Sequence, residues 1–82
     1  MIYPVFVVRD KINGFKPQLM IDQNQQSALR GFSYQINEDK FTNFSPSDYD
    51  LFDIGTFNTD SGEFESKLPE FIVNGASVLN EK

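Results

Sequence analysis

The side chains best suited to chemistry in this sequence are cations and aromatic rings in its first half. Arg9, Lys11 and Lys16 flank one predicted turn, so they are candidates to cluster in space. Cations that follow a phosphate chain, together with rings that stack on bases, are how proteins hold single-stranded nucleic acid. The residues of this candidate DNA-binding surface are Arg9, Lys11, Lys16, Arg30, Tyr3, Phe15 and Tyr34.

A structural interpretation of the same residues stays open. Tyr3 and Phe15 also suit a hydrophobic core, and the two lysines also suit a solvated turn that keeps a hairpin soluble. Arg30 and Tyr34 stand one helical turn apart and are equally consistent with an ordinary exposed pair on a helix. The residue types alone therefore do not separate a binding surface from a plain fold.

Charge is distributed unevenly along the chain, whose formal net charge is −5. Residues 1–40 hold five Lys and Arg against four Asp and Glu, a balance of +1, and residues 41–82 hold two against eight, a balance of −6. A chain with a pI of about 4.4 is a poor general binder of polyanions, because nonspecific affinity comes from neutralising phosphates. Any contact with DNA is therefore expected from a local patch in the first half.

Acidic residues gather in the second half, where Asp48, Asp50 and Asp53 precede Asp60. Strand alternation puts Asp50 and Asp53 on opposite faces, and no EF-hand spacing is present, so no metal site is predicted. An acidic face that mimics DNA is one alternative. Acidic side chains at sheet edges and turns that resist aggregation are the alternative that the sequence favours.

The sequence contains no His and no Cys, which removes several classes of chemistry. Without them there is no Ser-His-Asp triad, no Cys-His pair, no metal held by His or thiolate, and no disulfide. No spacing singles out two carboxylates as a catalytic acid and base. We therefore expect a protein that is not an enzyme and that holds no cofactor or metal.

The N-terminus lacks the basic start and the long apolar stretch of a signal peptide. No run approaches the roughly 18 apolar residues that span a bilayer. These features predict a soluble protein without membrane contact, and the absence of Cys suits a reducing, intracellular compartment.

A length of 82 residues is enough for one domain, 1–82, in which the part from about residue 69 is left unassigned. Nine Phe and no Trp predict a core built mainly on phenylalanine. A domain this small buries only about 60% of the surface of its unfolded chain, so it is expected to be marginal alone. Dimerisation is a common remedy, and a homodimer is expected here.

The first half predicts a hairpin followed by a helix. Residues 2–10 alternate as a strand with two largely apolar faces, so at least its middle should be covered on both sides. Asn13-Gly14 supplies the positive φ angles of a tight turn, and residues 15–21 return as a second strand. Asp22 or Asn24 then caps a helix that runs through residues 35–37. The apolar stripe of this helix consists of Ala28, Leu29, Phe32 and Ile36.

The second half predicts a loop and two more strands. The loop, residues 39–48, carries Phe41 and Phe44, which suit either a protein interface or the core, and Ser45-Pro46 is expected to open a single helical turn. Strands follow at 49–58 and 63–67, whereas residues 70–79 suit either a strand or a short helix. The order ββ-α-ββ predicts an α+β fold, a small antiparallel sheet with one helix packed across it.

Short segments spread over about residues 5–64 form a recognisable pattern. In the first half they are Val5-Phe6, Val8-Arg9-Asp10, and Ala28, Arg30 and Phe32. In the second half they are Pro46, Asp48, Tyr49, Leu51, Ile54, Gly55 and Phe57, followed by Asp60 and Gly62. In order and spacing this pattern resembles the non-structural protein of gokushoviruses, the small tailless single-stranded-DNA phages of the Microviridae. The stretch after Lys67 carries no resemblance.

The resemblance implies a role in viral DNA replication and in the switch to genome packaging, inside the cytoplasm of a bacterial host. It supplies no motif of DNA-contacting residues, so two functions stay open. The first is a module that binds single-stranded DNA, with binding lost on Arg9→Ala combined with Lys16→Ala. The second is an acidic factor that contacts phage replication or capsid proteins, or host proteins, without binding DNA. That second function predicts sensitivity to Phe44→Ala or to charge reversal at Asp50.

Overall fold

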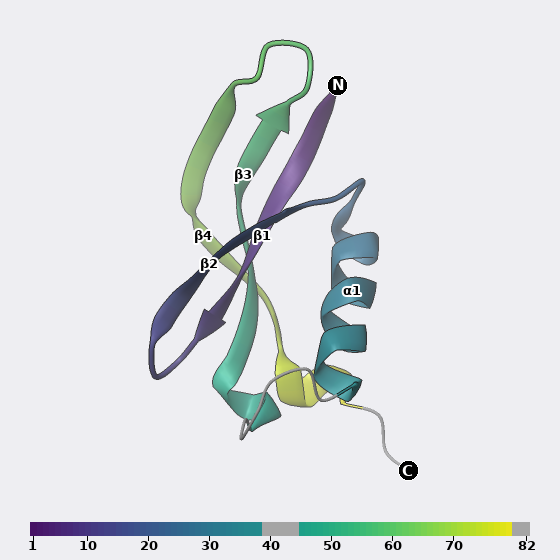
Figure 1. The fold of residues 1–82 in the computed structure, drawn as a ribbon, viewed down its shortest axis with the longest axis vertical. Coiled ribbons are helices and arrows are strands. Elements are labelled where there is room, and N and C mark those ends of the chain that lie inside the picture. Colours follow the sequence, from purple (N-terminus) through teal and green to yellow (C-terminus); the bar gives the residue numbers. More distant parts are fainter. Residues whose placement is uncertain (39–44, 80–82) are drawn as a thin grey trace.

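The computed structural model describes residues 1–38 and 45–79, and these ranges form one four-stranded antiparallel sheet with a helix alongside it (Figure 1). The elements are β1 (Ile2–Asp10), β2 (Gly14–Ile21), α1 (Gln25–Asn37), the 3-10 turn η1 (Pro46–Asp48), β3 (Tyr49–Asn58), β4 (Phe64–Asn74) and the 3-10 turn η2 (Gly75–Val78). The strands lie in the order β2-β1-β3-β4, so the two halves of the chain meet where β1 pairs with β3. The predicted α+β fold with ββ-α-ββ order is confirmed.

The hairpin of β1 and β2 closes where the sequence predicts it. The carboxylate of Asp10 accepts hydrogen bonds from the backbone N–H of Ile12 (2.9 Å) and from Nδ2 of Asn13 (3.0 Å). Gly14 then adopts a φ of 95°, a conformation that glycine reaches without steric cost. The turn is therefore held by the side chain that precedes it as well as by its glycine.

One strand is longer than the sequence predicts. β4 does not end at residue 67 but continues past Pro69 to Asn74, and η2 follows it. Asp53 pairs with Glu70 and Gly55 pairs with Ser66, so three residues of β4 bulge out opposite Ile54. Proline lacks an N–H and is tolerated at such a bulge on an edge strand. The ambiguous segment 70–79 is thus a strand first and a short helical turn afterwards.

The core lies between α1 and one face of the sheet. Ala28, Phe32 and Ile36 of α1 are buried against Phe6, Val8, Tyr49 and Leu51 of β1 and β3. Asn24, one of the two predicted caps, accepts a hydrogen bond from the backbone N–H of Ser27 at 2.9 Å. Leu29 is only half-buried, so the stripe is narrower than predicted. The helix therefore sits mainly over β1 and β3 and leaves the edge strand β2 beside it.

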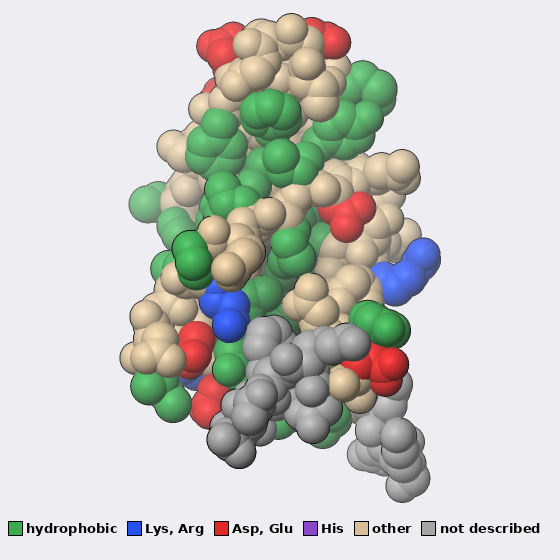
Figure 2. Space-filling view, in the orientation of Figure 1, with side chains coloured by type: hydrophobic (Ala, Val, Ile, Leu, Met, Phe, Trp, Pro, Cys, Tyr) green, Lys and Arg blue, Asp and Glu red, His purple; other side chains and the backbone are tan. Residues whose placement is uncertain are grey.

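The face of the sheet opposite α1, called the open face below, is also apolar. Val5, Val7 and Phe52 are buried there, although no helix of the described residues covers them. Strand pairing places Leu19 and Phe52 on either side of Val7, so larger side chains of neighbouring strands shield the centre of the sheet. Hydrophobic side chains accordingly form a band over the strands, with acidic side chains at the tip of the β3–β4 hairpin (Figure 2).

A candidate nucleic-acid interface

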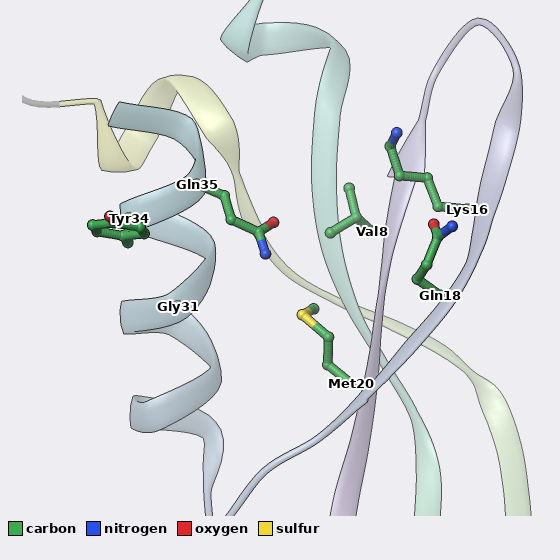
Figure 3. Close-up of a pocket in the computed structure, with 7 residues that line it drawn as sticks. All are labelled: Val8, Lys16, Gln18, Met20, Gly31, Tyr34 and Gln35. Carbon is green, nitrogen blue, oxygen red and sulfur yellow. The ribbon is translucent and has the colours of Figure 1, made fainter. Parts of the chain in front are cut away.

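A groove of about 570 Å³ lies between α1 and the β1–β2 hairpin (Figure 3). It exists because α1 packs over β1 and β3, so the side of β2 that faces the helix is left uncovered. Its volume falls in the range of about 300–1,000 Å³ that is typical of small-ligand sites. The residues that line it are Val8, Lys16, Gln18, Met20, Gly31, Tyr34 and Gln35.

The floor of this groove is apolar. Val8 is buried and belongs to the core, and Met20 is half-buried and packs against the same cluster. On the helix wall, Gly31 contributes no side chain, and a Cβ added there would meet nothing within 4 Å. The glycine that weakens the middle of α1 thus keeps the groove open at that point.

Polar side chains stand on both walls of the groove. Lys16 and Gln18 come from β2, and Tyr34 and Gln35 come from α1; the side chain of Gln35 reaches toward β2, whereas the ring of Tyr34 lies on the side of the helix away from β2 (Figure 3). Tyr34 is exposed, and an aromatic ring of this kind is the type of side chain on which a base stacks. Each Gln amide offers two donors and an acceptor to the edge of a planar ligand, and the ammonium of Lys16 offers a positive charge.

Lys16 is held at the groove by an aromatic ring. Its Nζ lies 5.5 Å from the centroid of the Tyr49 ring, within the range of a cation–π contact. Burial of Tyr49, together with the carboxylates of Asp10 and Asp48, raises the pKa of its phenol above the ordinary value. The phenol of Tyr49 therefore stays protonated at neutral pH.

The structure divides the predicted DNA-binding residues between the two faces of the sheet. Lys16 and Tyr34 line the same groove, Arg30 is exposed on α1 one turn before Tyr34, and Lys11 is exposed in the hairpin turn. Arg9 and Phe15 pair with each other across β1 and β2 on the open face. Neighbouring residues of a strand point to opposite faces, which is why Phe15 and Lys16 separate.

On the open face lie three of the predicted DNA-binding residues, Arg9, Phe15 and Tyr3, and each of them is next to other residues of the protein. Nη2 of Arg9 lies 3.2 Å from Oδ2 of Asp50, and its guanidinium lies 5.0 Å from the centroid of the Phe52 ring. Phe15 packs edge-on against Phe52, with 5.3 Å between ring centroids. Tyr3 pairs with Phe57 further along the same face. Arg9 and Lys16 are therefore not parts of one surface.

Five groove residues escape the sequence analysis: Val8, Gln18, Met20, Gly31 and Gln35. A usable signal exists for two of them, because Gln18 and Met20 alternate with Lys16 and must share its face of β2. The helix positions Gly31 and Gln35 become relevant only once the crossing of α1 over the sheet is known. Phe41 and Phe44 lie outside the described residues.

The acidic residues are placed as separate ion pairs and turn contacts. Asp50 is buried beside Arg9, so a charge reversal there tests folding rather than a surface contact. Asp53 lies 3.2 Å from Nζ of Lys67. Within the described ranges, no group of three or more His, Cys, Asp or Glu side chains is arranged to hold a metal ion. In those ranges, too, no helix has the length and apolarity needed to cross a membrane.

Comparison with known proteins gives one informative match. No curated protein and no solved structure matches this chain. A family model described as Phage ORF5 protein matches residues 3–78, a range that takes in β1 from its second residue onward, the other three strands, α1 and the whole lining of the groove. Because the match extends over nearly the entire sequence, the chain belongs to the phage ORF5 protein family.

Proposed function

We propose that this phage protein binds single-stranded DNA during replication or packaging of the viral genome, and that the groove between α1 and the hairpin receives the DNA. One observation carries the proposal: Lys16 and Tyr34, a cation and a ring from distant parts of the sequence, line one groove with two amides and an apolar floor. Membership of a phage family supports it. So does the resemblance to the non-structural proteins of gokushoviruses, whose genomes are single-stranded DNA.

The groove provides each contact that a nucleotide of a single strand needs. A base stacks on the exposed ring of Tyr34, and the amides of Gln18 and Gln35 hydrogen-bond to its edge. Lys16 contacts a neighbouring phosphate, and Arg30 lies on the same helix one turn away. Double-stranded DNA offers no unstacked base for this site, so the proposed ligand is a single strand.

The small number of cations at the groove sets the expected salt dependence. With only one or two phosphate contacts, the slope of log affinity against log salt is about −0.7 to −1.4 for a single strand. Raising salt from 50 to 200 mM should then weaken binding only about three- to sevenfold. Stacking and hydrogen bonds, rather than phosphate neutralisation, supply most of the affinity.

Fluorescence anisotropy with a labelled single-stranded oligonucleotide, at low and physiological salt, tests the proposal. Tyr34→Ala should weaken binding about 5- to 150-fold, because stacking of one base contributes about 1–3 kcal/mol. Tyr34→Phe keeps the ring and should bind within a few-fold of the original protein. Absence of binding at low salt would rule out the proposed function.

Lysine variants separate the groove from general electrostatics. Lys16→Gln should weaken binding and make the salt slope shallower by about 0.7. Lys67→Gln removes the same charge from β4, where Lys67 contacts Asp53 and Glu70 instead of the groove. Equal losses in the two variants would show that the groove has no special part in binding.

Filling the groove is a further test. Gly31→Leu places a bulky side chain on the groove wall at a position where the backbone leaves space. Leucine is also a better helix former than glycine by somewhat under 1 kcal/mol, so stability should be kept. The variant should retain its circular dichroism spectrum and thermal midpoint while losing DNA binding. Retained binding in a folded Gly31→Leu protein contradicts this location of the site.

The second candidate function is an acidic factor that contacts phage replication or capsid proteins. The observation in its favour is the exposed, carboxylate-rich β3–β4 hairpin, in which Glu63, Glu65 and Glu70 are all exposed. It predicts no DNA affinity at low salt. It also predicts binding to a purified phage replication or capsid protein that Glu65→Lys weakens and Lys16→Gln leaves intact.

A further inference from the structure

The open face of the sheet carries large apolar side chains, and those on the two edge strands, β2 and β4, are exposed. Pairing registers align Leu19, Val7, Phe52 and Phe71 in one row from β2 to β4. Phe52 is the centre of this row, and its ring packs edge-on against Phe71 at 5.9 Å between centroids. The members of the face that remain between 46% and 56% exposed are Phe15, Leu19, Ile21, Phe64 and Phe71.

This exposure is large for a protein of this size. An aromatic side chain presents about 150–250 Å² when free, so three half-exposed phenylalanines alone leave roughly 300 Å² of ring surface. Leu19 and Ile21 extend the same surface along β2. Contiguous apolar patches above a few hundred Å² mark sites where another molecule packs. A typical stable interface takes about 800 Å² from each partner, which such a patch and its rim can provide.

The charges on this face favour a protein partner over DNA. Arg9 is paired with Asp50 at 3.2 Å, so its charge is already balanced by a carboxylate. A phosphate would therefore meet no uncompensated charge at Arg9. Leu19 and Ile21 have no ring on which a base can stack.

We propose that the open face packs against the open face of a second copy of this chain, which gives a two-fold symmetric homodimer. A face that is apolar and locally neutral is complementary to itself, as a two-fold interface requires. Each chain carries a net charge of −5, so two copies repel unless they meet across a surface with balanced charge. When the sheets of the two copies pack face to face, both open faces are buried and both grooves remain exposed to solvent.

The dimer also removes a weakness of the single chain. The chain has only 82 residues, and α1 covers only one face of a sheet whose two faces are both apolar. Small domains of this kind commonly gain the rest of their stability from oligomerisation. In the proposed dimer, Val5, Val7 and Phe52 become the centre of a second core.

Sedimentation equilibrium across micromolar to hundred-micromolar protein tests the dimer. The original protein should reach twice the chain mass of 9.4 kDa. Leu19→Asp should raise the dimer dissociation constant at least 100-fold, because it places a charge within the apolar interface. Leu79→Asp is the matched control: Leu79 is 48% exposed against 56% for Leu19, the charge change is the same, and Leu79 follows η2, which hydrogen-bonds to α1.

Two outcomes overturn the proposal. One is a single-chain mass at every concentration. The other is a dimer that Leu19→Asp and Leu79→Asp affect equally. If the protein is a single chain and Leu19→Asp abolishes DNA binding, the open face is instead a nucleic-acid surface.

A thiol-labelling measurement covers the case in which Leu19→Asp does not fold. The sequence has no cysteine, so Leu19→Cys and Gln26→Cys each introduce one reactive thiol. The labelling rate at Leu19→Cys should fall at least tenfold as protein concentration rises, whereas Gln26→Cys, exposed on α1, should keep a constant rate. A constant rate at both sites overturns the dimer. None of these readouts requires DNA, so the dimer can fail while the proposed DNA binding stands.

Discussion

The side chain of Asp10 stabilises the β1–β2 turn, and this turn in turn positions residues of the candidate site. Its carboxylate accepts hydrogen bonds from the backbone N–H of Ile12 and from Nδ2 of Asn13, and these contacts lower its pKa below the ordinary value of 3.8. The same turn sets the register in which Arg9 faces one side of the sheet and Lys16 the other. The ionised form of Asp10 is thus favoured by the folded hairpin.

The depressed pKa of Asp10 predicts a pH dependence of stability. A carboxylate whose folded pKa is lowered contributes stability above its unfolded pKa, and that contribution disappears as pH falls through the folded value. Asp10→Asn keeps the side-chain oxygen that accepts from Ile12 but cannot ionise. In urea unfolding followed by circular dichroism, the variant should be less stable than the original protein at about pH 6. The difference should shrink as the pH falls below about 4, whereas a constant difference would contradict this role of Asp10.

At the scale of elements, two glycines have opposite structural roles. Gly55 lies where β4 bulges past β3, with a φ of 148°, and an added Cβ would collide with the backbone carbonyl oxygen of Glu65. Gly31 lies in the middle of α1, where an added Cβ meets nothing within 4 Å. Gly55 is required because β3 and β4 approach each other closely there. Gly31 is not required by the packing of α1, and its lack of a side chain only keeps the groove open.

Alanine at these two positions should therefore change stability in opposite directions. Gly55→Ala combines a strained backbone with a clash against β4 and should lower the free energy of unfolding by about 2–4 kcal/mol. Gly31→Ala should raise the free energy of unfolding by up to about 1 kcal/mol, because alanine is the better helix former. Chemical denaturation of both variants beside the original protein measures this contrast. A tolerated Gly55→Ala would show that the bulge is not needed for the pairing of β3 with β4.

On the scale of the whole molecule, the two proposed surfaces lie on opposite sides of the sheet. The groove opens beside α1, and the apolar patch lies on the face that α1 does not cover. In a dimer joined through the open faces, each copy presents its own groove to solvent. Binding of a long strand can then be bivalent, with the second groove engaged at a high effective concentration.

Bivalence predicts a dependence on oligonucleotide length. The original protein should bind a strand long enough to reach both grooves at least tenfold more tightly than a strand that fills one groove. Leu19→Asp, as a single chain with an intact groove, should bind the short strand normally and gain little from the longer one. Anisotropy titrations with the two lengths make the comparison. If affinity depends equally on oligonucleotide length in the original protein and in Leu19→Asp, dimerisation has no part in DNA binding.

Local patterns in the sequence determined most of the elements. Alternation over residues 2–10, the Asn13-Gly14 turn and the helical spacing of Ala28, Phe32 and Ile36 depend on neighbouring residues, and the structure confirms them. The C-terminal end of β4 did not follow from such a local pattern, because it depends on pairing with β3. Only pairing with β3 lets the strand bulge at Pro69 and continue to Asn74.

The sequence by itself determined the α+β fold, the hairpin, the helix and an excess of cations in the first half, because these follow from short-range periodicity and composition. Only the tertiary structure decided which of those side chains meet. The crossing of α1 over β1 and β3 creates the groove that joins Lys16 to Tyr34, and the pleat of the sheet sends Arg9 to the other face. The uncovered open face likewise depends on where one helix packs on a sheet with two apolar sides. Such contacts join residues far apart in the chain, and no local pattern encodes them.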